Sequence, residues 1–328
     1  MEDFSLNRRA FLGSLGALAV QPPTQPPTPR RGNPSASASA VPPLGAGGLC
    51  IFSKHLHWLS VPEMAREVAA LGFEGVDLTV RKGGHVAPER VAEDLPVAVA
   101  AIRKVGLEVP MIVTDITDPN HPATEALLKT AGKLDIAHYR MGWIDYDASV
   151  GVVKSLDGFR KRFEKLAKLN QKYNIQGAYQ NHSGARLGAS LWDLWTVIRD
   201  LDPRWIGCQY DVKHAVAEGG VSWVNGLEIL KNHIKCLDIK DFHWAKKDGK
   251  WQHHLVPLGE GMVDYPLYLS LLKKHQITGP MSIHYEFPLG GADTGKTQLS
   301  MPKEQVLAAF KKDLNTLQTM LKTAGLRA

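Results

Sequence analysis

The segment Trp205-Ile-Gly-Cys-Gln-Tyr-Asp-Val-Lys-His214 contains the pattern that recurs through the rest of the chain. It begins as an apolar and aromatic run after the turn signal Asp202-Pro203, which predicts a β-strand. It ends in Asp211 and His214, an anionic oxygen and an imidazole, at the point where the strand should end. The segment therefore predicts a strand whose carboxyl end carries chemically active groups.

Three other segments end in the same way, with polar side chains after a small or apolar run. They are 177–182, ending in Gln180, Asn181 and His182; 234–241, ending in Asp238, Lys240 and Asp241; and 279–286, ending in His284 and Glu286. Side chains on a strand alternate between its two faces, so residues two apart point the same way. Polar groups that converge at one end of several strands predict a functional site, and we expect it to contain a metal.

From about residue 48, strand-like and helix-like runs alternate with no break in composition. The predicted strands are 49–54, 75–80, 109–115, 137–143, 177–182, 205–211, 234–241 and 279–286. The first helix opens with the capping box Ser60-Val-Pro-Glu63 and ends before Gly72. The other predicted helices are 91–105, 123–133, 152–173, 191–201, 223–232, 265–275 and 303–323.

Eight strand–helix units in roughly 280 residues predict a (β/α)8 barrel, the TIM-barrel architecture, as a single domain over residues 46–328. A doubly wound open sheet would usually carry a Gly-rich phosphate-binding turn after an early strand, and the sequence has none. Barrel strands carry their chemistry at their carboxyl ends. Because side chains alternate between the two faces of each strand, one polar set is expected to point into the barrel. Its members are Lys54, Asp77, Asp115, Arg140, Gln180, His182, Gln209, Asp211, Asp238, Lys240, His284 and Glu286.

The first 45 residues do not fit this pattern. Asn7-Arg-Arg-Ala-Phe-Leu12, followed by the apolar run 13–20, resembles a twin-arginine export signal. Residues 21–43 are rich in Pro, Thr, Ser and Ala and predict a disordered linker. The apolar run is shorter than the roughly 20 residues needed to span a bilayer. We therefore expect a periplasmic or otherwise exported protein with no stable membrane anchor after signal cleavage.

Composition excludes several classes of partner. The 39 basic and 33 acidic residues give a net charge of +6 without a basic run, so neither nucleic acid nor an anionic membrane is expected to bind. The three cysteines are odd in number and lie in predicted strands, so a disulfide framework is not expected. The apolar stripe of the last helix either packs on the barrel or forms a partner face, which leaves a homo-oligomer open.

The segment from about residue 48 to 325 resembles the xylose-isomerase-like TIM barrels of the sugar phosphate isomerase/epimerase family. The motifs that carry the resemblance are Gly72-Phe-Glu-Gly-Val-Asp-Leu78, Asn181-His-Ser-Gly184, Asp211-x-x-His214, Ile239-Lys-Asp241 and His284-Tyr-Glu286. The family includes ketose 3-epimerases, hydroxypyruvate isomerases and inosose dehydratases, with endonuclease IV as a more distant relative. The resemblance implies a small-molecule carbohydrate substrate.

The resemblance also implies one divalent metal, held by a Glu from strand five, an Asp from strand six, a His from strand seven and a Glu from strand eight. The two glutamates of the family also shuttle the proton. This chain keeps Asp211 but has Gln180, Asp238 and His284 at the other three positions. The set still offers oxygen and nitrogen ligands, which suit Mn²⁺ or Zn²⁺ best, with Mg²⁺, Co²⁺ or Fe²⁺ as alternatives.

Because both family glutamates are replaced, a symmetric two-base mechanism is not expected to carry over unchanged. Lys240, Glu286 and His182 are the candidate catalytic acids and bases. Lys240 is the first choice, because a cation beside a metal is expected to have a lowered pKa. The alternative for Lys240 is a plain salt bridge to Asp211 or Glu286.

Five residues are candidates for substrate contact. Arg140 is expected to bind a carboxylate, a phosphate or sugar hydroxyls through its planar guanidinium, or else to pair with an internal aspartate, Asp77 or Asp115. The other candidates are Asn181 and His214 from the family motifs, His85 in the loop after the second strand, and Trp143, which could stack on a sugar. A surface histidine and simple aromatic packing are the alternatives for His85 and Trp143.

The predicted function is a divalent-metal-dependent isomerase or epimerase that acts on a free sugar or keto-sugar by enolate or enediolate proton transfer. One alternative is a lyase or hydratase acting on 3-keto-glycosides or their unsaturated products, because elimination needs one acid and one base rather than two matched bases. The other alternative is a non-catalytic carbohydrate-binding barrel.

Overall fold

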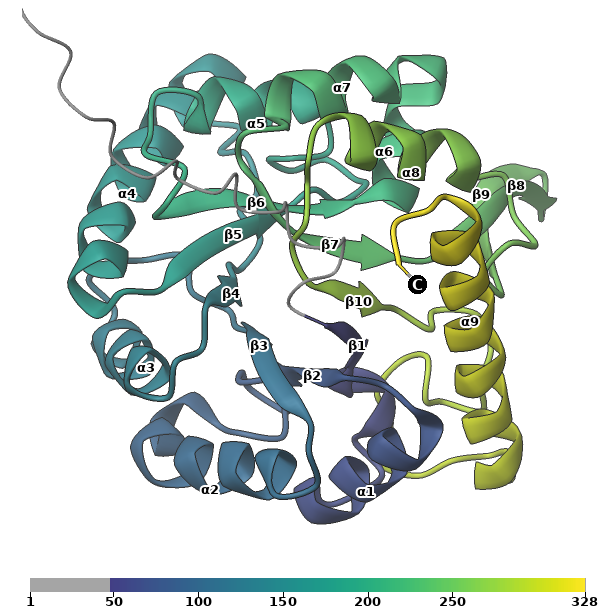
Figure 1. Cartoon of the computed structure of the whole chain (residues 1–328). Helices are drawn as coiled ribbons and strands as arrows, with labels where there is room; N and C mark the ends of the chain where they lie inside the picture. Colours follow the sequence, from purple (N-terminus) through teal and green to yellow (C-terminus); the bar gives the residue numbers. More distant parts are fainter. Residues whose placement is uncertain (1–47, 328) are drawn as a thin grey trace, which may run out of the picture. The chain divides into compact units, whose positions relative to one another are not determined.

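Eight parallel strands close into a barrel in the computed structural model, which describes residues 48–327 (Figure 1). Around the barrel the strands follow the order β1-β10-β7-β6-β5-β4-β3-β2. Their bounds are β1 Leu49–Phe52, β2 Gly75–Thr79, β3 Glu108–Val113, β4 His138–Arg140, β5 Gln176–Gln180, β6 Ile206–Asp211, β7 Ile234–Ile239 and β10 Met281–Ile283. The predicted (β/α)8 barrel is confirmed.

Helices surround the strands on the outside of the barrel (Figure 1). They are α1 Val61–Leu71, α2 Val91–Arg103, α3 Pro122–Lys133, α4 Val152–Tyr173, α5 Leu191–Ile198, α6 Val212–Gly219, α7 Trp223–Leu230, α8 Tyr265–Lys274 and α9 Lys303–Thr323, with short 3-10 turns at Ser53–Leu56, Pro88–Arg90 and Gly220–Ser222. Helix α1 begins at the predicted capping box, where the Ser60 backbone N–H donates to Glu63 Oε2 at 3.0 Å. It ends at Gly72, whose φ of 89° is a left-handed conformation that glycine adopts without strain.

The barrel interior changes from apolar to polar along the strands. Met111, Ala178 and Cys236 form a fully buried apolar cluster. Buried polar side chains, Gln180 on β5 and Asp238 on β7, lie two residues further along the strands that carry Ala178 and Cys236. All three cysteines are buried and free, which agrees with the expected absence of a disulfide framework. The strands therefore deliver polar groups to one end of an otherwise apolar core.

Helix α9 packs against α1 and α8 and buries its apolar stripe. Phe310, Leu314, Leu317 and Leu321 are all fully buried. Tyr285, just after β10, donates its hydroxyl to the Phe310 carbonyl at 2.8 Å, which ties the helix to the barrel. The stripe is therefore part of the protein's own core, and the partner-face interpretation of it is wrong. A homo-oligomer stays a prediction.

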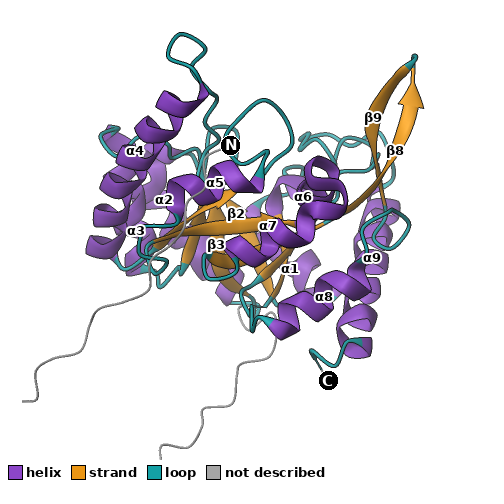
Figure 2. Cartoon of the chain, turned by 90° about the horizontal axis from the view of Figure 1, so that it is seen from above, coloured by secondary structure: helices purple, strands orange, loops and turns teal. Residues whose placement is uncertain are grey.

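Two elements were not predicted from the sequence. An antiparallel hairpin, β8 Asp241–Lys247 and β9 Lys250–Val256, follows β7 and extends away from the barrel (Figure 2). Its turn, Asp248-Gly249, has positive φ at both residues, which is a standard hairpin signal. Helix α6 starts directly after β6, and the side chain of Asp211 caps it by accepting from the His214 backbone N–H.

The carboxylate of Asp241 anchors the base of this hairpin. Its Oδ1 accepts backbone N–H groups from Phe242 at 2.8 Å and Val263 at 3.2 Å. Its Oδ2 accepts those of Gly259 and Gly261, each at 3.0 Å. A Cβ on Gly261 would lie 2.1 Å from Asp241 Oδ1, so only glycine allows this approach. Asp241 therefore joins the start of β8 to the segment that returns from β9.

The described residues, 48–327, all belong to one compact unit. No helix within residues 48–327 combines the length and the apolar character that crossing a bilayer requires. The predicted export signal and linker, residues 1–45, lie outside the described residues. The export signal and the periplasmic location therefore stay predictions.

We predict that Asp241→Asn lowers the free energy of unfolding by roughly 2–4 kcal/mol, because charge-assisted hydrogen bonds to four backbone groups are weakened and an NH₂ group faces backbone donors. Urea denaturation followed by circular dichroism measures this change. The matched control, Asp157→Asn on the exposed surface of α4, should stay within about 0.5 kcal/mol of the wild type. Equal stability of the two variants would contradict the anchoring role.

Candidate active site

A cluster of buried polar side chains occupies the carboxyl end of the barrel. We call it the polar cluster, and its members are Asp77, Arg140, Gln180, Asp211, Asp238, Lys240, His284 and Glu286. Seven of these residues are at most 4% exposed, while the Glu286 side chain is 25% exposed. Lys240, His284 and Glu286 lie just beyond the ends of β7 and β10, so the predicted strands extended a few residues too far. Glu286 is the member most open to solvent.

Lys240 joins two of the carboxylates. Its Nζ lies 3.0 Å from Asp211 Oδ2 and 3.0 Å from Glu286 Oε2. Burial lowers the pKa of Lys240, but the charges of Asp211, Glu286 and Asp238 outweigh this effect and raise the pKa above its ordinary value. The expected lowering of this pKa is therefore wrong for this arrangement of charges. Lys240 is a permanent cation held by salt bridges to Asp211 and Glu286, which was the alternative role considered for it from the sequence.

Gln180 bridges the guanidinium and the carboxylates. Arg140 Nη1 donates to Gln180 Oε1 at 3.0 Å, and Gln180 Nε2 donates to Asp211 Oδ2 at 3.0 Å and Asp238 Oδ2 at 2.6 Å. A guanidinium can only donate, so the amide oxygen must face Arg140 and the NH₂ group must face the carboxylates. In this arrangement Gln180 offers no oxygen to a cation beside Asp211 or Asp238.

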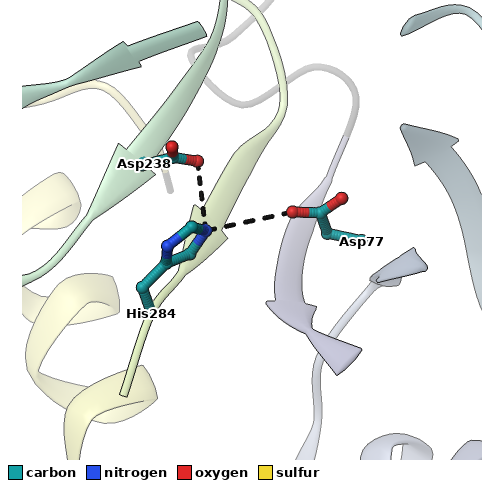
Figure 3. A group of neighbouring side chains, drawn as sticks. All are labelled: Asp77, Asp238 and His284. Carbon is teal, nitrogen blue, oxygen red and sulfur yellow. Dashed lines mark ion pairs between the residues drawn. The ribbon is translucent and has the colours of Figure 1, made fainter. Parts of the chain in front are cut away.

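A second group lies on the other side of Asp238 and consists of Asp77, Asp238 and His284 (Figure 3). His284 Nε2 is 3.2 Å from Asp238 Oδ1 and 3.9 Å from Asp77 Oδ2. Within residues 48–327, neither ring nitrogen of His284 has a hydrogen-bond partner, and Asp77 Oδ1 has none either. Burial, offset in part by His284 and reinforced by Asp238, raises the pKa of Asp77 to about 6.

The four residues predicted as metal ligands are thus linked by pairwise contacts, but their side chains do not point towards one common centre. Gln180 bonds to Asp211 and Asp238, while Asp238 and His284 turn towards Asp77. Two carboxylates and an imidazole are a ligand set that suits Zn²⁺, Mn²⁺ and similar cations. The group of Asp77, Asp238 and His284 could therefore hold a metal ion, whereas Asp211 already faces an ammonium group.

Three predicted residues lie in the β5–β6 region beside the polar cluster. Asn181 exchanges two hydrogen bonds with the backbone of Asp211, so its amide is used to hold β5 and β6 together. His214 Nδ1 accepts from the Ser183 backbone N–H at 3.1 Å, which leaves the ring proton on Nε2, 3.7 Å from Asp211. His182 stacks on His214 with ring centroids 3.8 Å apart.

The protonation of His182 follows from its contacts. Its Nδ1 lies 2.8 Å from the Ser183 carbonyl and must donate to it, so Nε2 carries the lone pair. Burial, followed by the charge of Lys240, lowers the pKa of His182 to about 3. The ring is therefore neutral near pH 7 and has one nitrogen able to accept a proton.

Arg140 and Trp143 lie together at the end of β4. The guanidinium of Arg140 is 4.9 Å from the Trp143 ring, and His182 contacts the same ring at a centroid distance of 4.4 Å. Among residues 48–327, Arg140 forms no ion pair with Asp77 or Asp115. Burial lowers the pKa of Arg140 to about 10, so it stays charged. Trp143 is 36% exposed and offers an open aromatic surface beside this cation.

His85 lies apart from the polar cluster. Its Nδ1 and its backbone N–H both contact Thr79 Oγ1, at 3.1 and 3.0 Å. Its ring packs edge-on against His57. These contacts fix the loop after β2, and none of them reaches a member of the polar cluster, so the structure does not bring His85 together with the other predicted site residues.

The sequence-based prediction missed two members of this region. Asp77 was identified as pointing inward but was not included among the ligands. Lys213, inside the Asp211-x-x-His214 motif, is buried with its Nζ 2.9 Å from His253 Nδ1 and 3.4 Å from His214 Nδ1. His253 comes from the hairpin strand β9, so this contact could be found only after the hairpin was known.

We predict opposite effects for two buried lysines. Lys240→Met should lower the free energy of unfolding by roughly 3–5 kcal/mol, because it leaves a buried carboxylate without its counter-ion. Lys213 has no carboxylate within ion-pair distance among residues 48–327, and burial lowers its pKa from 10.5 to about 8. Lys213→Met should therefore stabilise the protein below pH 8, by up to about 3 kcal/mol.

The sign of the Lys213 effect follows from proton linkage. Between about pH 8 and 10.5 the unfolded state binds more protons than the folded state, so wild-type stability rises with pH in this window. The advantage of Lys213→Met should therefore fade across the same window. Denaturant titrations at several pH values measure both variants, and equal effects of the two substitutions would contradict the assignment of charges.

Solved structures with the same fold share little sequence with this chain. A xylose isomerase domain protein from Planctomyces limnophilus is 15% identical, with a TM-score of 0.62 over 87% of this chain and 99% of that one. D-psicose 3-epimerase from Clostridium cellulolyticum H10, solved with D-tagatose, is 13% identical, with a TM-score of 0.63 over 84% and 99% of the two chains. An IOLI protein with a bound zinc atom is 14% identical, with a TM-score of 0.63 over 84% and 98%.

At these identities the solved structures establish the fold alone. No curated protein matches the chain in sequence. The family model described as xylose isomerase-like TIM barrel matches residues 65–309, which is most of the chain and includes every member of the polar cluster. The chain therefore belongs to the xylose isomerase-like TIM barrel family.

Proposed function

We propose that this protein is a divalent-metal-dependent isomerase or epimerase that acts on a free sugar or keto-sugar through an enolate or enediolate. The observation that carries the proposal is the composition of the polar cluster, in which a carboxylate and imidazole set lies beside the permanently charged Lys240. Solvent reaches the carboxylate of Glu286, which is the most exposed member of the polar cluster. A metal, a fixed cation and an accessible base are the groups that proton transfer next to a carbonyl requires.

Asp238 and His284 would hold the metal, with further ligands from their neighbours in the polar cluster. A divalent ion there would polarise a substrate carbonyl and make the adjacent C–H bond more acidic. Mn²⁺ or Zn²⁺ is our preferred identity, and Mg²⁺, Co²⁺ or Fe²⁺ also suits these donors. Metals occur in relatives of this fold, which include the IOLI protein with zinc and a Mycobacterium smegmatis protein in complex with magnesium.

Lys240 supplies a fixed positive charge and a hydrogen-bond donor. Its ammonium group has three N–H bonds, of which two are directed to Asp211 and Glu286. The third can donate to a substrate oxygen on which negative charge develops. Because the pKa of Lys240 is raised, the group keeps its charge at neutral pH and acts through electrostatic stabilisation rather than as a base.

Glu286 and His182 are the proton acceptors. Lys240 and Lys54 hold the pKa of Glu286 well below its usual range despite its partial burial, so this carboxylate is ionised at neutral pH. It is also the member of the polar cluster that a substrate can approach from solvent. His182 offers its unprotonated Nε2 from the neighbouring strand end. We assign removal of the proton to Glu286, and His182 is the second acceptor.

Arg140, Trp143 and His214 would position the sugar. The open ring of Trp143 can stack on a pyranose face, and the guanidinium of Arg140 can donate to sugar oxygens. Such a substrate agrees with export from the cytoplasm, which we propose from the twin-arginine motif. Asn181 acts indirectly, because its amide holds the backbone of Asp211 in place.

A lyase or hydratase acting on 3-keto-glycosides is the second candidate. One observation favours it, because Gln180 and His284 replace the two matched family bases and leave a single carboxylate base, Glu286, beside the ammonium group of Lys240. Elimination requires one base to remove the proton and a fixed positive charge to stabilise the enolate, and this pair offers both. The same fold is found in proteins described as a 3-keto-D-glucoside 4-epimerase and a probable 3-DHS dehydratase.

The test is incubation of the metal-loaded protein with ketohexoses, inososes and 3-keto-glucosides in deuterated water, followed by NMR and mass spectrometry. We expect deuterium at a single carbon next to the carbonyl. An unsaturated or hydrated product would select the lyase or hydratase, and saturable sugar binding without exchange or turnover would establish a non-catalytic carbohydrate-binding barrel and contradict the enzymatic proposal.

We predict that Glu286→Gln lowers the rate of deuterium incorporation by roughly 10²–10⁴, the usual contribution of a positioned base. Asp157→Asn, on the exposed surface of α4, is the control and should leave the rate unchanged. A rate for Glu286→Gln within about threefold of the wild type would exclude Glu286 as the base and would direct attention to His182 Nε2.

A further inference from the structure

We propose that one divalent cation binds between Asp77, Asp238 and His284, and that the ammonium group of Lys240 takes the position beside Asp211. The metal would then be held by β2, β7 and the end of β10, with neither Gln180 nor Asp211 among its ligands (Figure 3). This inference refines the metal requirement of the proposed function and rests on it, but its test is metal binding without substrate.

The balance of charge favours a bound cation at this position. Asp77 and Asp238 are both fully buried. Among residues 48–327, neither carboxylate has a lysine or arginine within ion-pair distance, and each has only His284. With a neutral imidazole the three residues together carry a charge of about −2, and burying such charge without compensation costs several kcal/mol per ion. One divalent cation would neutralise it.

The donor atoms of the three residues face one another. One ligand atom from each of Asp77, Asp238 and His284 lies within 4.8 Å of the others. Zinc bonds of about 2.0–2.2 Å place neighbouring ligand atoms roughly 3–3.6 Å apart. The distance of 3.2 Å from His284 Nε2 to Asp238 lies within this range, and the distance of 3.9 Å to Asp77 lies just above it, so a small side-chain shift would close the shell.

Surrounding residues orient these ligands. Phe52 stacks on the His284 ring with centroids 4.5 Å apart. Ser282 Oγ donates to Asp77 Oδ2 at 2.9 Å, and Gln209 Nε2 donates to Asp238 Oδ1 at 2.7 Å. Hydrogen bonds of this kind to ligating carboxylates are a regular feature of metal sites. They leave Asp77 Oδ1 and His284 Nε2 without a hydrogen-bond partner among residues 48–327, and a bound cation would supply one.

A cation beside Asp211 would meet a different environment. Asp211 Oδ2 receives hydrogen bonds from Gln180 and Lys240, and its Oδ1 receives the His214 N–H at 3.1 Å. A metal at this carboxylate would have to displace the ammonium group or lie next to it, at a high electrostatic cost in a buried site. The charge of Lys240 therefore directs the metal away from Asp211 and towards Asp77.

The alternative to a metal ion between these residues is a proton on the His284 ring. A protonated His284 between the two aspartates would also reduce the negative charge of the group. The two cases differ in whether the chelator-treated protein binds a divalent cation, since a metal that binds here must displace the imidazole proton.

The test is titration of the chelator-treated full-length protein with Co²⁺ and Zn²⁺, followed by visible absorption and isothermal titration calorimetry. We expect one equivalent to bind the wild type. Asp77→Asn should weaken binding by more than about 100-fold, and Ser282→Ala, which keeps every ligand, should weaken it by roughly 10-fold. Asp211→Asn is the matched control, since it also converts a buried aspartate of the polar cluster to asparagine, and should change affinity by less than about threefold.

Circular dichroism and thermal unfolding confirm that each variant is folded, and Ser282→Ala keeps the test decisive if Asp77→Asn does not fold. Loss of metal binding in Asp211→Asn with retention in Asp77→Asn would overturn the proposal, as would a wild type that binds no divalent metal. Inactivity towards every sugar would leave this result intact, because the titrations contain no substrate. Failure of the metal site and failure of the proposed reaction are thus distinguishable.

Discussion

The ion pairs of Lys240 with Asp211 and Glu286 are the interaction on which the rest of the site depends. The ammonium group is buried, and its two 3.0 Å contacts neutralise carboxylates that could not otherwise remain ionised away from water. Because they also raise its pKa, Lys240 cannot release its proton near neutral pH. It is therefore a fixed charge, and the positions proposed for the base and for the metal follow from where that charge lies.

The barrel makes this arrangement possible by bringing distant parts of the chain to one end. Asp77 comes from β2 and His284 follows β10, and β1 alone separates these strands in the closed sheet. Gln180 connects the two halves of the polar cluster, because its NH₂ group donates to both Asp211 and Asp238. Because this amide is used as a bridge, it offers no oxygen to a cation, which is consistent with the proposed metal position beside Asp77.

The repeating strand and helix pattern was enough to predict the closed barrel, and the polar strand ends were enough to predict at which end of it buried polar side chains gather. The hairpin β8–β9 was missed because its strands alternate polar with half-buried residues and its Asp248-Gly249 turn was not recognised. The pKa direction of Lys240 could not be predicted, because it depends on which carboxylates surround the ammonium group in three dimensions. The pairing of Asp77 with His284 likewise exists only once the barrel has closed.

Anomalous diffraction from crystals grown with Mn²⁺ or Zn²⁺ tests the central claim most directly, because it locates the cation relative to Lys240. The account predicts one anomalous peak between Asp77, Asp238 and His284, with Lys240 still within hydrogen-bond distance of Asp211 and Glu286. A peak bonded to Asp211, with the Lys240 side chain turned out of the site, would contradict it.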